Sequence, residues 1–594
     1  MKSTMMDVPL SVTQIFTYGA SVFGDTEVTS WGTSGPETIT FSALAGRAAA
    51  CAHALRSLCG IDADQRIGTM MDNCAEHLEV FFASSCMGAV FTPLNSHLSD
   101  DQIIHIINYA DQKVIVVSPR NAPRLARLIA DCPGVDHIVI ASGSSVQRAE
   151  AVAAFDAVPK PHFSVTDYEA FIDGQSTEFP WPDLPEDTAA ALCFSTGTEG
   201  APKGVAYSHR SMFLHSQSLL GVDSFAITNG VSFLCCVPIY HVLSWGVPLA
   251  AWMAGAPLIF PGEDLSAPRL AQVIATSMPR TAHGVPTLWV SLFSYYFHNP
   301  PKRMSLREIF AGGAPVPPVL IKVWEEKFGV DVIHCWGMTE TSPVGTVSRP
   351  PAGLSGETRD LYRESQGRFP VAMNFRIADD AGHVLKGHDR NQGEIQVRGN
   401  WVTGSYFHSP TGEGDGPASR FRGEAIDYAD DRFTDDGWFR TGDVGSINRD
   451  GFLTVNDRIR DVIRSGGEWI YSAELENYVV DAPPVLECAV IGYPDETWGE
   501  RPLAVTVLAD GVERSAATAE RLRTRLRGVI PGWMIPEYWA FVDTIDKTSV
   551  DKYDKKDLRQ HLADGKLDVI SLQGPRRSGD SYGDPSSSSS PSQG

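Results

Sequence analysis

The pattern that most limits the fold of this chain is the alternation of strand-like and helix-like segments between residues 40 and 200. Phe41 to Leu58 is rich in alanine, has helical periodicity and ends near Gly60. Short apolar runs at Arg66 to Met71, Lys113 to Val117 and His137 to Ala141 are typical of buried strands. Because strands separated by helices pair in parallel through helical crossovers, the pattern predicts an α/β fold with helix-flanked sheets.

The character of the sequence changes near residue 457. Two strand-like runs, Glu487 to Val490 and Leu503 to Leu508, follow a helix-like segment at Ser472 to Val480 and indicate a smaller α+β unit. A chain of 594 residues is also too long for one ordinary core. We therefore predict a large N-terminal domain with a small β-subdomain at 1–456, a short connection at 457–461, a smaller C-terminal domain at 462–565 and a disordered tail at 566–594.

Composition argues against several classes of function. The net charge of −23 disfavours non-specific binding to nucleic acid or to anionic membranes. The ten cysteines are scattered without a C-x-x-C pair, so a disulfide framework or a zinc site is not expected. This pattern fits a protein in the reducing cytoplasm. The N-terminus has one lysine and no sustained apolar stretch, which does not match a signal peptide.

Two further segments invite an interpretation. Residues 224–262 contain no Asp, Glu, Lys or Arg, but prolines, glycines and His241 interrupt them. We interpret this segment as buried strand, loop and helix lining an apolar pocket, rather than as a membrane span. Gly404 to Phe433 is rich in Gly, Asp and Arg, which predicts a long surface loop.

The most informative segment is a glycine-rich loop between two apolar strands, Ala189 to Phe194 and Val205 to Tyr207. Its glycines allow successive backbone N–H groups to point at one anion, its hydroxyls add donors or a magnesium ligand, and its lysine adds positive charge. An ordinary Ser/Thr/Gly-rich hairpin is the alternative, and the Walker pattern is absent. The candidate phosphate-binding residues are Ser195, Thr196, Gly197, Thr198, Glu199, Gly200 and Lys203.

This loop resembles the P-loop of the adenylate-forming (AMP-binding) superfamily, which contains acyl-CoA synthetases, firefly-type luciferases and peptide-synthetase adenylation domains. The match is complete except at Glu199, where that superfamily has Thr or Ser. The resemblance extends from Val8 to about His561. Within the superfamily, the chain resembles the medium- and long-chain fatty-acyl-CoA synthetases in particular.

Further nucleotide motifs follow in the order that the resemblance implies. Gly313, Ala314 and Pro315 look like the adenine-side loop, and Trp336, Gly337, Met338 and Thr339 look like the Y-G-M-T-E motif. The resemblance implies that Trp336 stacks on adenine, that Thr339 contacts phosphate and that Asp443, in a W-F-x-T-G-D motif, binds ribose. Glu340 and Ser195 are the implied magnesium ligands, and a carboxylate is a hard oxygen ligand suited to this ion. Gly393 to Gly399 is similar to a family segment that we interpret as structural.

The C-terminal motifs imply a mobile lid. Asp457 to Asp461 resembles the segment in which the first arginine reaches ribose and a later residue is the hinge, which implies these roles for Arg458 and Arg460. Gly466, Gly467, Glu468 and Trp469 are the implied lining of the CoA channel. Lys552 aligns with the lysine that bridges carboxylate and α-phosphate, where a cation stabilises the charge developing during adenylation. At the neighbouring position Asp551 replaces the usual glycine.

The acyl pocket is implied by a P-M-F-H-V-N-A-W-G-like segment at Pro238 to Gly246. The resemblance implies that His241 borders the acyl carboxylate and that Trp245 gates an apolar channel, with Val242 and Gly313 as further contacts. Lys552, His241 and Glu340 are the candidate catalytic residues. Each buried CH₂ of a substrate adds ~0.8 kcal/mol, so channel depth would select chain length.

Together these motifs predict a ligase that activates a carboxylic acid with ATP and Mg²⁺ to acyl-AMP and then forms a thioester with coenzyme A, releasing AMP and pyrophosphate. A medium- or long-chain fatty acid is the expected substrate, in a cytoplasmic enzyme of lipid metabolism, and a homodimer is left open. Two alternatives remain at this point: an acyl-AMP ligase that loads a carrier protein, and a nucleotide- or acyl-binding protein with lapsed catalysis, motivated by Glu199 and Asp551. A luciferase is supported on fold grounds only.

Overall fold

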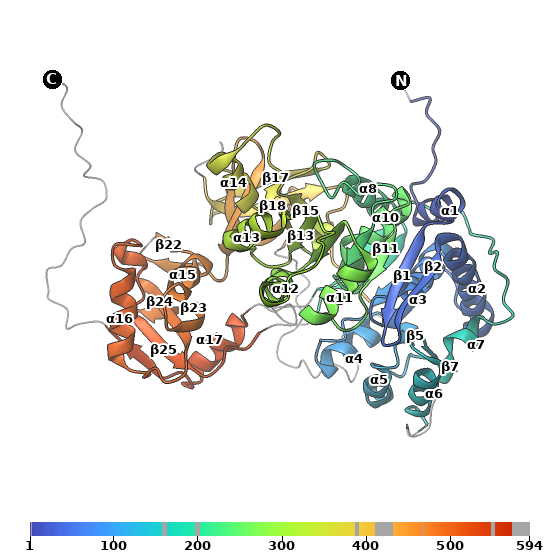
Figure 1. The fold of residues 1–594 in the computed structure, drawn as a ribbon, viewed down its shortest axis with the longest axis horizontal. Coiled ribbons are helices and arrows are strands. Elements are labelled where there is room, and N and C mark those ends of the chain that lie inside the picture. The colour runs from blue at the N-terminus through green and yellow to red at the C-terminus, as the bar shows by residue number, and fades with distance from the viewer. Residues whose placement is uncertain are drawn as a thin grey trace. The chain divides into compact units, whose positions relative to one another are not determined.

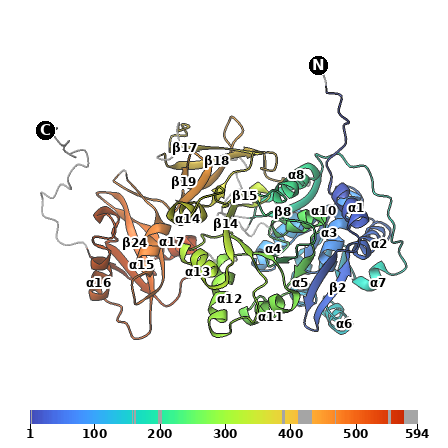
Figure 2. The same ribbon diagram turned by 45° about the horizontal axis from the view of Figure 1, so that its top comes forward.

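The computed structural model describes residues 1, 3–156, 158, 163–195, 202–385, 391–409, 432–466, 468–547 and 553–572. The chain divides into two compact units, the first comprising Met1–Val455 and the second beginning at Asn456. Figures 1 and 2 show the helices and strands of both units. Helix-flanked sheets in a large N-terminal unit and a smaller C-terminal α+β unit confirm the predicted fold class.

A 7-stranded sheet forms one part of the N-terminal unit, in the order β7-β6-β5-β3-β4-β8-β9. Its strands from β7 to β8 pair in parallel, as the alternation predicted, whereas β8 and β9 pair antiparallel. This antiparallel pair flanks the glycine-rich segment in the sequence. The strands are β3 (Arg66–Met70), β4 (Val90–Pro93), β5 (Gln112–Val117), β6 (His137–Ile140), β7 (Ser164–Asp167), β8 (Ala189–Phe194) and β9 (Gly204–Ser208).

A 13-stranded sheet carries most of the predicted site, in the order β17-β18-β19-β20-β16-β15-β14-β13-β12-β10-β11-β1-β2. The neighbours β10, β12, β13 and β14 pair in parallel, and antiparallel strands follow from β15. Its strands are β1 (Glu27–Gly32), β2 (Gly35–Thr40), β10 (Phe233–Cys235), β11 (Leu258–Phe260), β12 (Thr281–Gly284), β13 (Glu308–Gly312), β14 (Asp331–Gly337), β15 (Val344–Val347), β16 (Gly367–Arg368), β17 (Met373–Ala378), β18 (Gly393–Gly399), β19 (Phe439–Ile447) and β20 (Phe452–Arg458).

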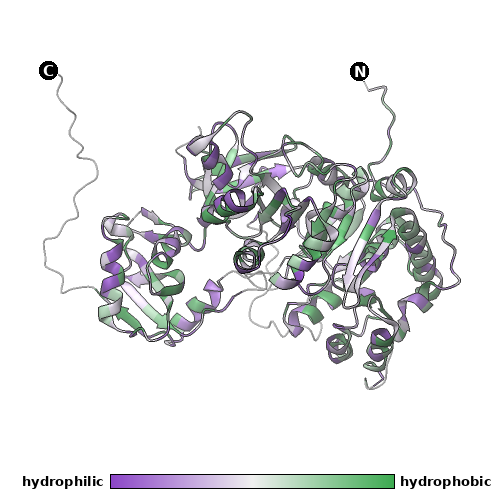
Figure 3. Cartoon of the chain, viewed as in Figure 1, coloured by the Kyte–Doolittle hydropathy of each residue, from purple (hydrophilic) through white to green (hydrophobic). Residues whose placement is uncertain are grey.

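The core of the N-terminal unit lies around a helix that contacts both sheets. Helix α3 (Ala75–Met87) touches β1 of the larger sheet and β4 and β8 of the smaller one. Its residues 77–87 are all buried, and Figure 3 shows hydrophobic colours on many helices and strands of the N-terminal unit. Because α3 is buried over three turns and contacts strands of both sheets, it lies between them. The second long helix, α2 (Phe41–Cys59), packs on it and ends at Gly60 with φ +66°.

The other helices of this unit are α1 (Val12–Val22), α4 (Asp100–Tyr109), α5 (Ala122–Leu128), α6 (Ser145–Ala153), α7 (Tyr168–Ile172), α8 (His209–Leu219), α9 (Val242–Trp245), α10 (Val247–Ala254), α11 (Ala267–Ser277), α12 (Pro286–His298), α13 (Pro318–Phe328) and α14 (Gly356–Glu364), with short 3₁₀ turns at Ile129–Asp131 and Thr339–Thr341. The uncharged segment 224–262 consists of β10, α9, α10 and β11 with loops between them. Within the described residues, no helix has the length and apolarity needed to cross a membrane.

The described residues of the C-terminal unit form three helices and one sheet. The strands are β21 (Ile463–Ser465), β22 (Glu468–Ile470), β23 (Val485–Asp495), β24 (Gly499–Leu508), β25 (Tyr538–Val542) and β26 (Val569–Ser571), and the helices are α15 (Ser472–Val480), α16 (Ala516–Leu526) and α17 (Lys555–Ala563), with a 3₁₀ turn at Gly532–Met534. Strand β26 corrects the predicted tail at 566–594, because its backbone pairs with β25. The prediction relied on the composition of the later residues, and 573–594 lie outside the described part of the chain.

Candidate active site

Three predicted motifs, and Gly284 between them, lie at the carboxyl ends of neighbouring parallel strands. The acyl segment 238–246 follows β10, Gly284 ends β12, Gly312 ends β13 and Trp336 lies near the end of β14. These strands are adjacent in the larger sheet, with Gly312 paired to Cys335. In open α/β sheets, ligands bind outside the carboxyl ends of the strands. Segments separated by up to a hundred residues of sequence therefore share one edge of the sheet.

A direct hydrogen bond joins the two motifs that the sequence predicted to bind adenine and ribose. Trp336 Nε1 donates to Asp443 Oδ2 at 2.7 Å, and Asp443 is only 3% exposed. The indole also lies against Gly345, where a Cβ would come within 2.5 Å of Trp336 Cζ3. Only a residue without a side chain fits at that position. The bond and this close packing fix the orientation of both Trp336 and Asp443.

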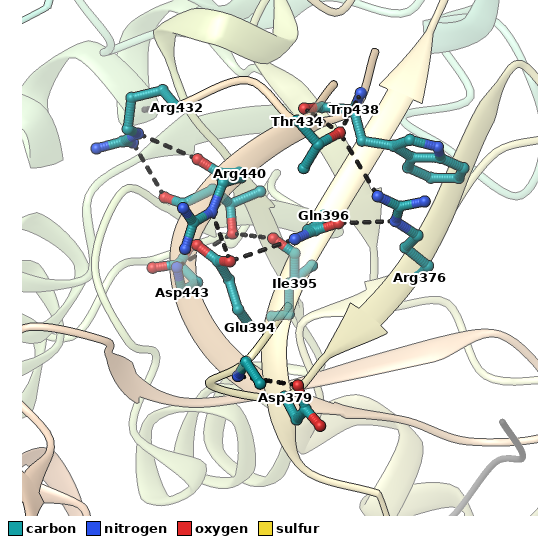
Figure 4. A network of polar contacts seen from close by, with 12 residues as sticks. Arg376, Asp379, Glu394, Ile395, Gln396, Arg432, Thr434, Trp438, Arg440 and Asp443 are labelled. Atoms are coloured by element: carbon teal, nitrogen blue, oxygen red, sulfur yellow. Dashed lines mark hydrogen bonds and ion pairs between the residues drawn. The ribbon is translucent and has the colours of Figure 1, made fainter. Parts of the chain in front are cut away.

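A polar network behind Asp443 holds its strand in register (Figure 4). The Thr441 hydroxyl donates to Ile395 O at 2.7 Å and accepts from the Asp443 N–H at 3.1 Å. Glu394 accepts from Arg440 at 2.9 Å. Arg376, Gln396, Arg432, Thr434 and Trp438 extend the network. The segment 393–399, interpreted from sequence as structural, thus lies beside Asp443 and supports its strand.

On the phosphate side, one unpredicted tyrosine connects two predicted residues. Lys203 Nζ lies 4.7 Å from the centre of the Tyr406 ring, and the Tyr406 hydroxyl donates to Glu340 Oε1 at 2.6 Å. Ser195 Oγ accepts from the Lys203 N–H at 3.2 Å, which closes the base of the loop. Thr196, Gly197, Thr198, Glu199 and Gly200 lie outside the described residues.

The arrangement around Glu340 fits a magnesium ion shared with a bound phosphate. Glu340 is buried, and Tyr406 hydrogen bonds one of its two oxygens. Among the described residues, no group of three or more His, Cys, Asp or Glu could hold a metal ion. Mg²⁺ commonly binds through one or two carboxylates and completes its shell with water and substrate phosphate oxygens, so a single buried carboxylate is sufficient.

The neighbouring turn is held by backbone contacts. Tyr207 donates its hydroxyl to Thr339 O at 2.7 Å, and the Thr403 N–H donates to Glu340 O at 2.9 Å. Burial raises the pKa of Tyr207 well above its usual value, so this hydroxyl remains a donor. Gly337 admits no side chain, because a Cβ would lie 1.9 Å from Pro343 O. The Met338 N–H donates to Thr341 Oγ1 at 3.0 Å.

The acyl segment contains a left-handed turn of four residues that are not glycine. Val242, Leu243, Ser244 and Trp245 have φ of 46°, 56°, 54° and 57°. Such a conformation costs roughly 1–2 kcal/mol for each L-residue, because Cβ approaches the following carbonyl. The turn is therefore maintained by its surroundings, and strain of this kind concentrates at functional sites.

The turn directs Trp245 toward the adenine-side glycines. A Cβ at Gly312 would lie 3.3 Å from Trp245 Cη2, and one at Gly313 would lie 4.0 Å from Cζ2. Gly313 has φ +79° and is exposed, and the neighbouring Ala314 and Pro315 are at least partly exposed. His241 immediately precedes the turn. Burial, with a contribution from His97, lowers the pKa of His241 to about 4, so its imidazole is neutral at physiological pH.

The remaining predicted residues belong to the C-terminal unit. Arg458 and Arg460 lie in the segment that opens this unit, and Arg460 O accepts from Arg559 at 3.2 Å. Gly466 has φ +62° and lies against Trp498, whose Cε3 would be 2.5 Å from an added Cβ. Glu468 and Trp469 are in β22. Gly467 and Lys552 lie outside the described residues.

Sequence reasoning missed several residues that shape the site. Residues 404–409 form a loop, as predicted, but the Tyr406 side chain within it is only 4% exposed, and 410–431 are not described. Asn73, Ser244 and His283 hydrogen bond around the acyl turn. No local pattern marks these residues, because their partners are distant in sequence.

Comparisons with known proteins concern the family and the fold of the chain. The AMP-binding enzyme family matches residues 16–407, and the AMP-binding enzyme C-terminal domain family matches residues 474–552. A 3-methylmercaptopropionyl-CoA ligase of Ruegeria lacuscaerulensis is 36% identical, over 95% of this chain and 99% of that protein. A medium-chain-fatty-acid–CoA ligase of Ectopseudomonas oleovorans is 34% identical, over 95% and 98%. The crystal structure of the anthranilate CoA ligase AuaEII with anthranoyl-AMP has a TM-score of 0.76 at 22% identity, covering 95% of this chain and 100% of that one.

Proposed function

The chain belongs to the AMP-binding enzyme family, and on this premise we propose that it is an AMP-forming acid–CoA ligase for an apolar monocarboxylic acid of medium or long chain. In the first step a carboxylate oxygen attacks the α-phosphorus of ATP and pyrophosphate leaves. In the second step the CoA thiolate attacks the acyl carbonyl and AMP leaves. The observation that carries the proposal is that the acyl turn, Trp336 and Glu340 lie at the carboxyl ends of strands of one sheet. Trp336 hydrogen bonds Asp443, and Tyr406 connects Glu340 to Lys203.

In the proposed nucleotide site, Trp336 offers an aromatic face to adenine and Asp443 accepts hydrogen bonds from the ribose hydroxyls. One oxygen of Asp443 already accepts from Trp336, which orients the carboxylate before the nucleotide binds. Lys203 and the N–H groups of the glycine-rich loop would bind phosphate. The adenine-side contacts extend to Gly313, Ala314, Pro315, Gly337, Met338 and Thr339.

Glu340 is the proposed magnesium ligand, with Ser195 as a second candidate. A bound Mg²⁺ would offset phosphate charge and polarise the α-phosphate. The hydrogen bond from Tyr406 fixes one carboxylate oxygen of Glu340 and leaves the second for the ion. Such outer contacts orient metal ligands and tune their affinity.

The proposed acid site lies between His241 and Trp245. A neutral His241 can hydrogen bond the carboxylate but adds no full charge, so it does not neutralise the attacking oxygen. The uncharged surroundings from 224 to 262 favour an apolar tail. The 36% identity to a 3-methylmercaptopropionyl-CoA ligase makes a short thioether acid the second candidate substrate.

The C-terminal unit is proposed to act as the lid. Arg458 would reach ribose, Arg460 would be the hinge, Lys552 would bridge the acid and the α-phosphate, and residues 466–469 would line the CoA channel. One cation between two approaching anions stabilises the transition state of adenylation. The scattered thiols, all of them free, support a cytoplasmic location, where ATP and CoA are available.

Pyrophosphate release with a panel of acids, measured with and without CoA, tests the proposal. We expect release that depends on the acid, acyl-CoA as the product, and highest kcat/KM for straight-chain acids of medium or greater length. Highest kcat/KM for the thioether acid would favour the second candidate. Transfer to a carrier protein but not to CoA would contradict the proposed acceptor.

A further inference from the structure

The left-handed acyl turn is connected to three buried polar side chains from distant parts of the chain. Asn73 follows β3 in the smaller sheet, His283 lies in β12 of the larger sheet, and Ser244 is in the turn itself. Their exposed fractions are 6%, 0% and 0%. A buried polar side chain is stable only when its hydrogen bonds are satisfied, so the partners of these three residues indicate what each one holds.

All three side chains converge on the backbone of one residue, Val237. Its carbonyl accepts from Asn73 Nδ2 at 2.8 Å and from Ser244 Oγ at 2.7 Å, and its N–H donates to His283 Nδ1 at 3.4 Å. Asn73 binds this strand end twice more, because Nδ2 also donates to Cys235 O at 3.1 Å and Oδ1 accepts from the Ile239 N–H at 2.8 Å. The segment that leads to His241 is thereby fixed on both sides.

One tautomer of His283 satisfies its hydrogen bonds to both Val237 and Ser244. Burial lowers the pKa of His283 to about 4, so the ring is neutral, and an acceptor Nδ1 leaves the proton on Nε2. Nε2 lies 3.0 Å from Ser244 O and 3.1 Å from Ser244 Oγ, so this N–H donates into the turn. The hydroxyl of Ser244 can then give its own proton to Val237 O. Each of these atoms has a defined donor or acceptor role.

The same histidine also contacts the residue that faces the proposed substrate. The rings of Trp245 and His283 pack edge to face at 5.3 Å between centroids, and the indole reaches Gly312. Any relaxation of the turn toward the favoured right-handed region would rotate Trp245 away from both neighbours. The position of Trp245 therefore depends on the contacts of Ser244.

We propose that Asn73, Ser244 and His283 are positioning residues that hold residues 242–245 in the left-handed form and thereby set acid selectivity through Trp245. The inference rests on the proposed acid–CoA ligase function. None of the three needs to touch the acid, because they act through the backbone of Val237 and the turn. Substituting these residues should change the binding of the acid rather than the binding of ATP, because their contacts lie on the acyl side.

A pair of substitutions at one position tests the claim. Ser244→Ala removes the hydroxyl and keeps a Cβ in the disfavoured conformation, whereas Ser244→Gly removes the hydroxyl and also the Cβ that makes the conformation costly. We expect Ser244→Ala to raise KM for the preferred acid roughly tenfold, as loss of one buried hydrogen bond does. It should also reduce the ratio of kcat/KM between that acid and a shorter homologue. KM for ATP should stay within about twofold, and Ser244→Gly should recover much of the loss.

A matched control is available in α3. Ser85 is also 0% exposed, and its hydroxyl donates to Ala190 O at 2.8 Å. Ser85→Ala should change neither acid selectivity nor KM for the acid. The inference is contradicted if Ser244→Ala behaves like this control, if KM for ATP and KM for the acid rise together, or if the glycine variant is no better than the alanine variant.

Hydrogen exchange of a peptide covering 237–246 gives a readout that needs no catalysis. Exchange should be faster in Ser244→Ala, and in Asn73→Ser as a second variant, than in the unmodified protein and in Ser85→Ala. Unchanged exchange would overturn the role of the side chains even if the ligase activity is confirmed. An unmodified protein that forms no acyl-CoA from any acid would instead contradict the proposed function and the claim about acid selectivity with it.

Discussion

At the scale of single residues, the contact between Trp336 and Asp443 links two motifs that are 107 positions apart. A hydrogen bond to a charged acceptor is shorter and stronger than one between neutral groups, and this one is buried. The indole therefore holds the carboxylate of Asp443, and the Thr441 hydroxyl holds its backbone N–H.

Asp443→Asn should weaken nucleotide binding selectively. The amide keeps the shape of the side chain but loses the charge and one acceptor, so we expect KM for ATP to rise by roughly 10-fold or more, with little change in KM for the acid. Initial rates at varied ATP and at varied acid measure the two constants. Asp435→Asn, at an exposed position of the same hairpin, is the control. Equal rises in both KM values would argue against a ribose contact.

Glu340 is the proposed magnesium ligand, and Tyr406 donates a hydrogen bond to it. Glu340→Gln should raise the Mg²⁺ concentration needed for half-maximal pyrophosphate release, because a neutral amide is a weaker ligand. Tyr406→Phe should shift the same curve by a smaller factor, since it removes only the hydrogen bond that orients the carboxylate. Titration of Mg²⁺ at saturating ATP and acid compares the variants. A curve that neither substitution moves would remove Glu340 from the metal site.

At the scale of elements, several boundaries were predictable because the deciding forces are local. The strand Ala189–Phe194 and the helix Ser472–Val480 have the predicted bounds, and the helix predicted at 41–58 extends one residue further, to Cys59. The turn at 242–245 could not be predicted, because Val, Leu, Ser and Trp have no preference for left-handed backbone. Tyr406 lies 66 residues from Glu340, so their contact depends on tertiary packing alone.

Helices α15 and α17 of the C-terminal unit are joined through a buried ionic group. Lys555 Nζ lies 2.7 Å from Glu476 Oε1 and donates to Ser472 Oγ at 2.6 Å, and Ser472 in turn donates to Asp457. Burial lowers the pKa of Lys555, but Glu476, Asp457 and Asp461 raise it and prevail. Burial also raises the pKa of Glu476 and of Asp457. The positive charge of Lys555 thus offsets the negative charges of Glu476, Asp457 and Asp461.

Lys555→Met should destabilise the C-terminal unit by ~3–5 kcal/mol, because the carboxylates are left buried without their cation. The double variant Lys555→Met/Glu476→Gln should lose less, since one of those carboxylates is neutralised. Lys556→Met, at the neighbouring exposed position, is the control. Pulse proteolysis in urea, with cleavage followed within α15 and α17, measures the change. A Lys555 variant as stable as the control would show that the group contributes little.

At the scale of the whole molecule, buried neutral histidines connect stability to pH. Burial lowers the pKa to about 3 or 4 for six histidines in the N-terminal unit: His77, His209, His215, His241, His283 and His334. The unfolded chain protonates each of them near pH 6.5, whereas the folded chain does so only near pH 4 or below. Between these values the unfolded state binds more protons, so the free energy of unfolding falls as pH falls.

We therefore expect the protein to unfold in acid within the window from about pH 6.5 to 4, with each histidine contributing a slope of up to ~1.4 kcal/mol per pH unit. In His209→Asn, the amide oxygen can replace Nδ1 as the acceptor for the Val12 N–H. This variant should show a shallower dependence of unfolding free energy on pH. The same substitution at exposed His298 should leave the slope unchanged. Equal slopes in the two variants would contradict the prediction.

The two proposed half-reactions predict which product receives an oxygen atom of the carboxylic acid. When a carboxylate oxygen attacks the α-phosphorus and CoA later attacks the acyl carbonyl, the bridging oxygen leaves with AMP. An acid labelled with ¹⁸O in its carboxylate should therefore give acyl-CoA together with AMP that carries one ¹⁸O atom for each thioester formed. Mass spectrometry of the AMP measures this transfer. Unlabelled AMP, or label found in phosphate or ADP instead, would contradict the acyl-adenylate route.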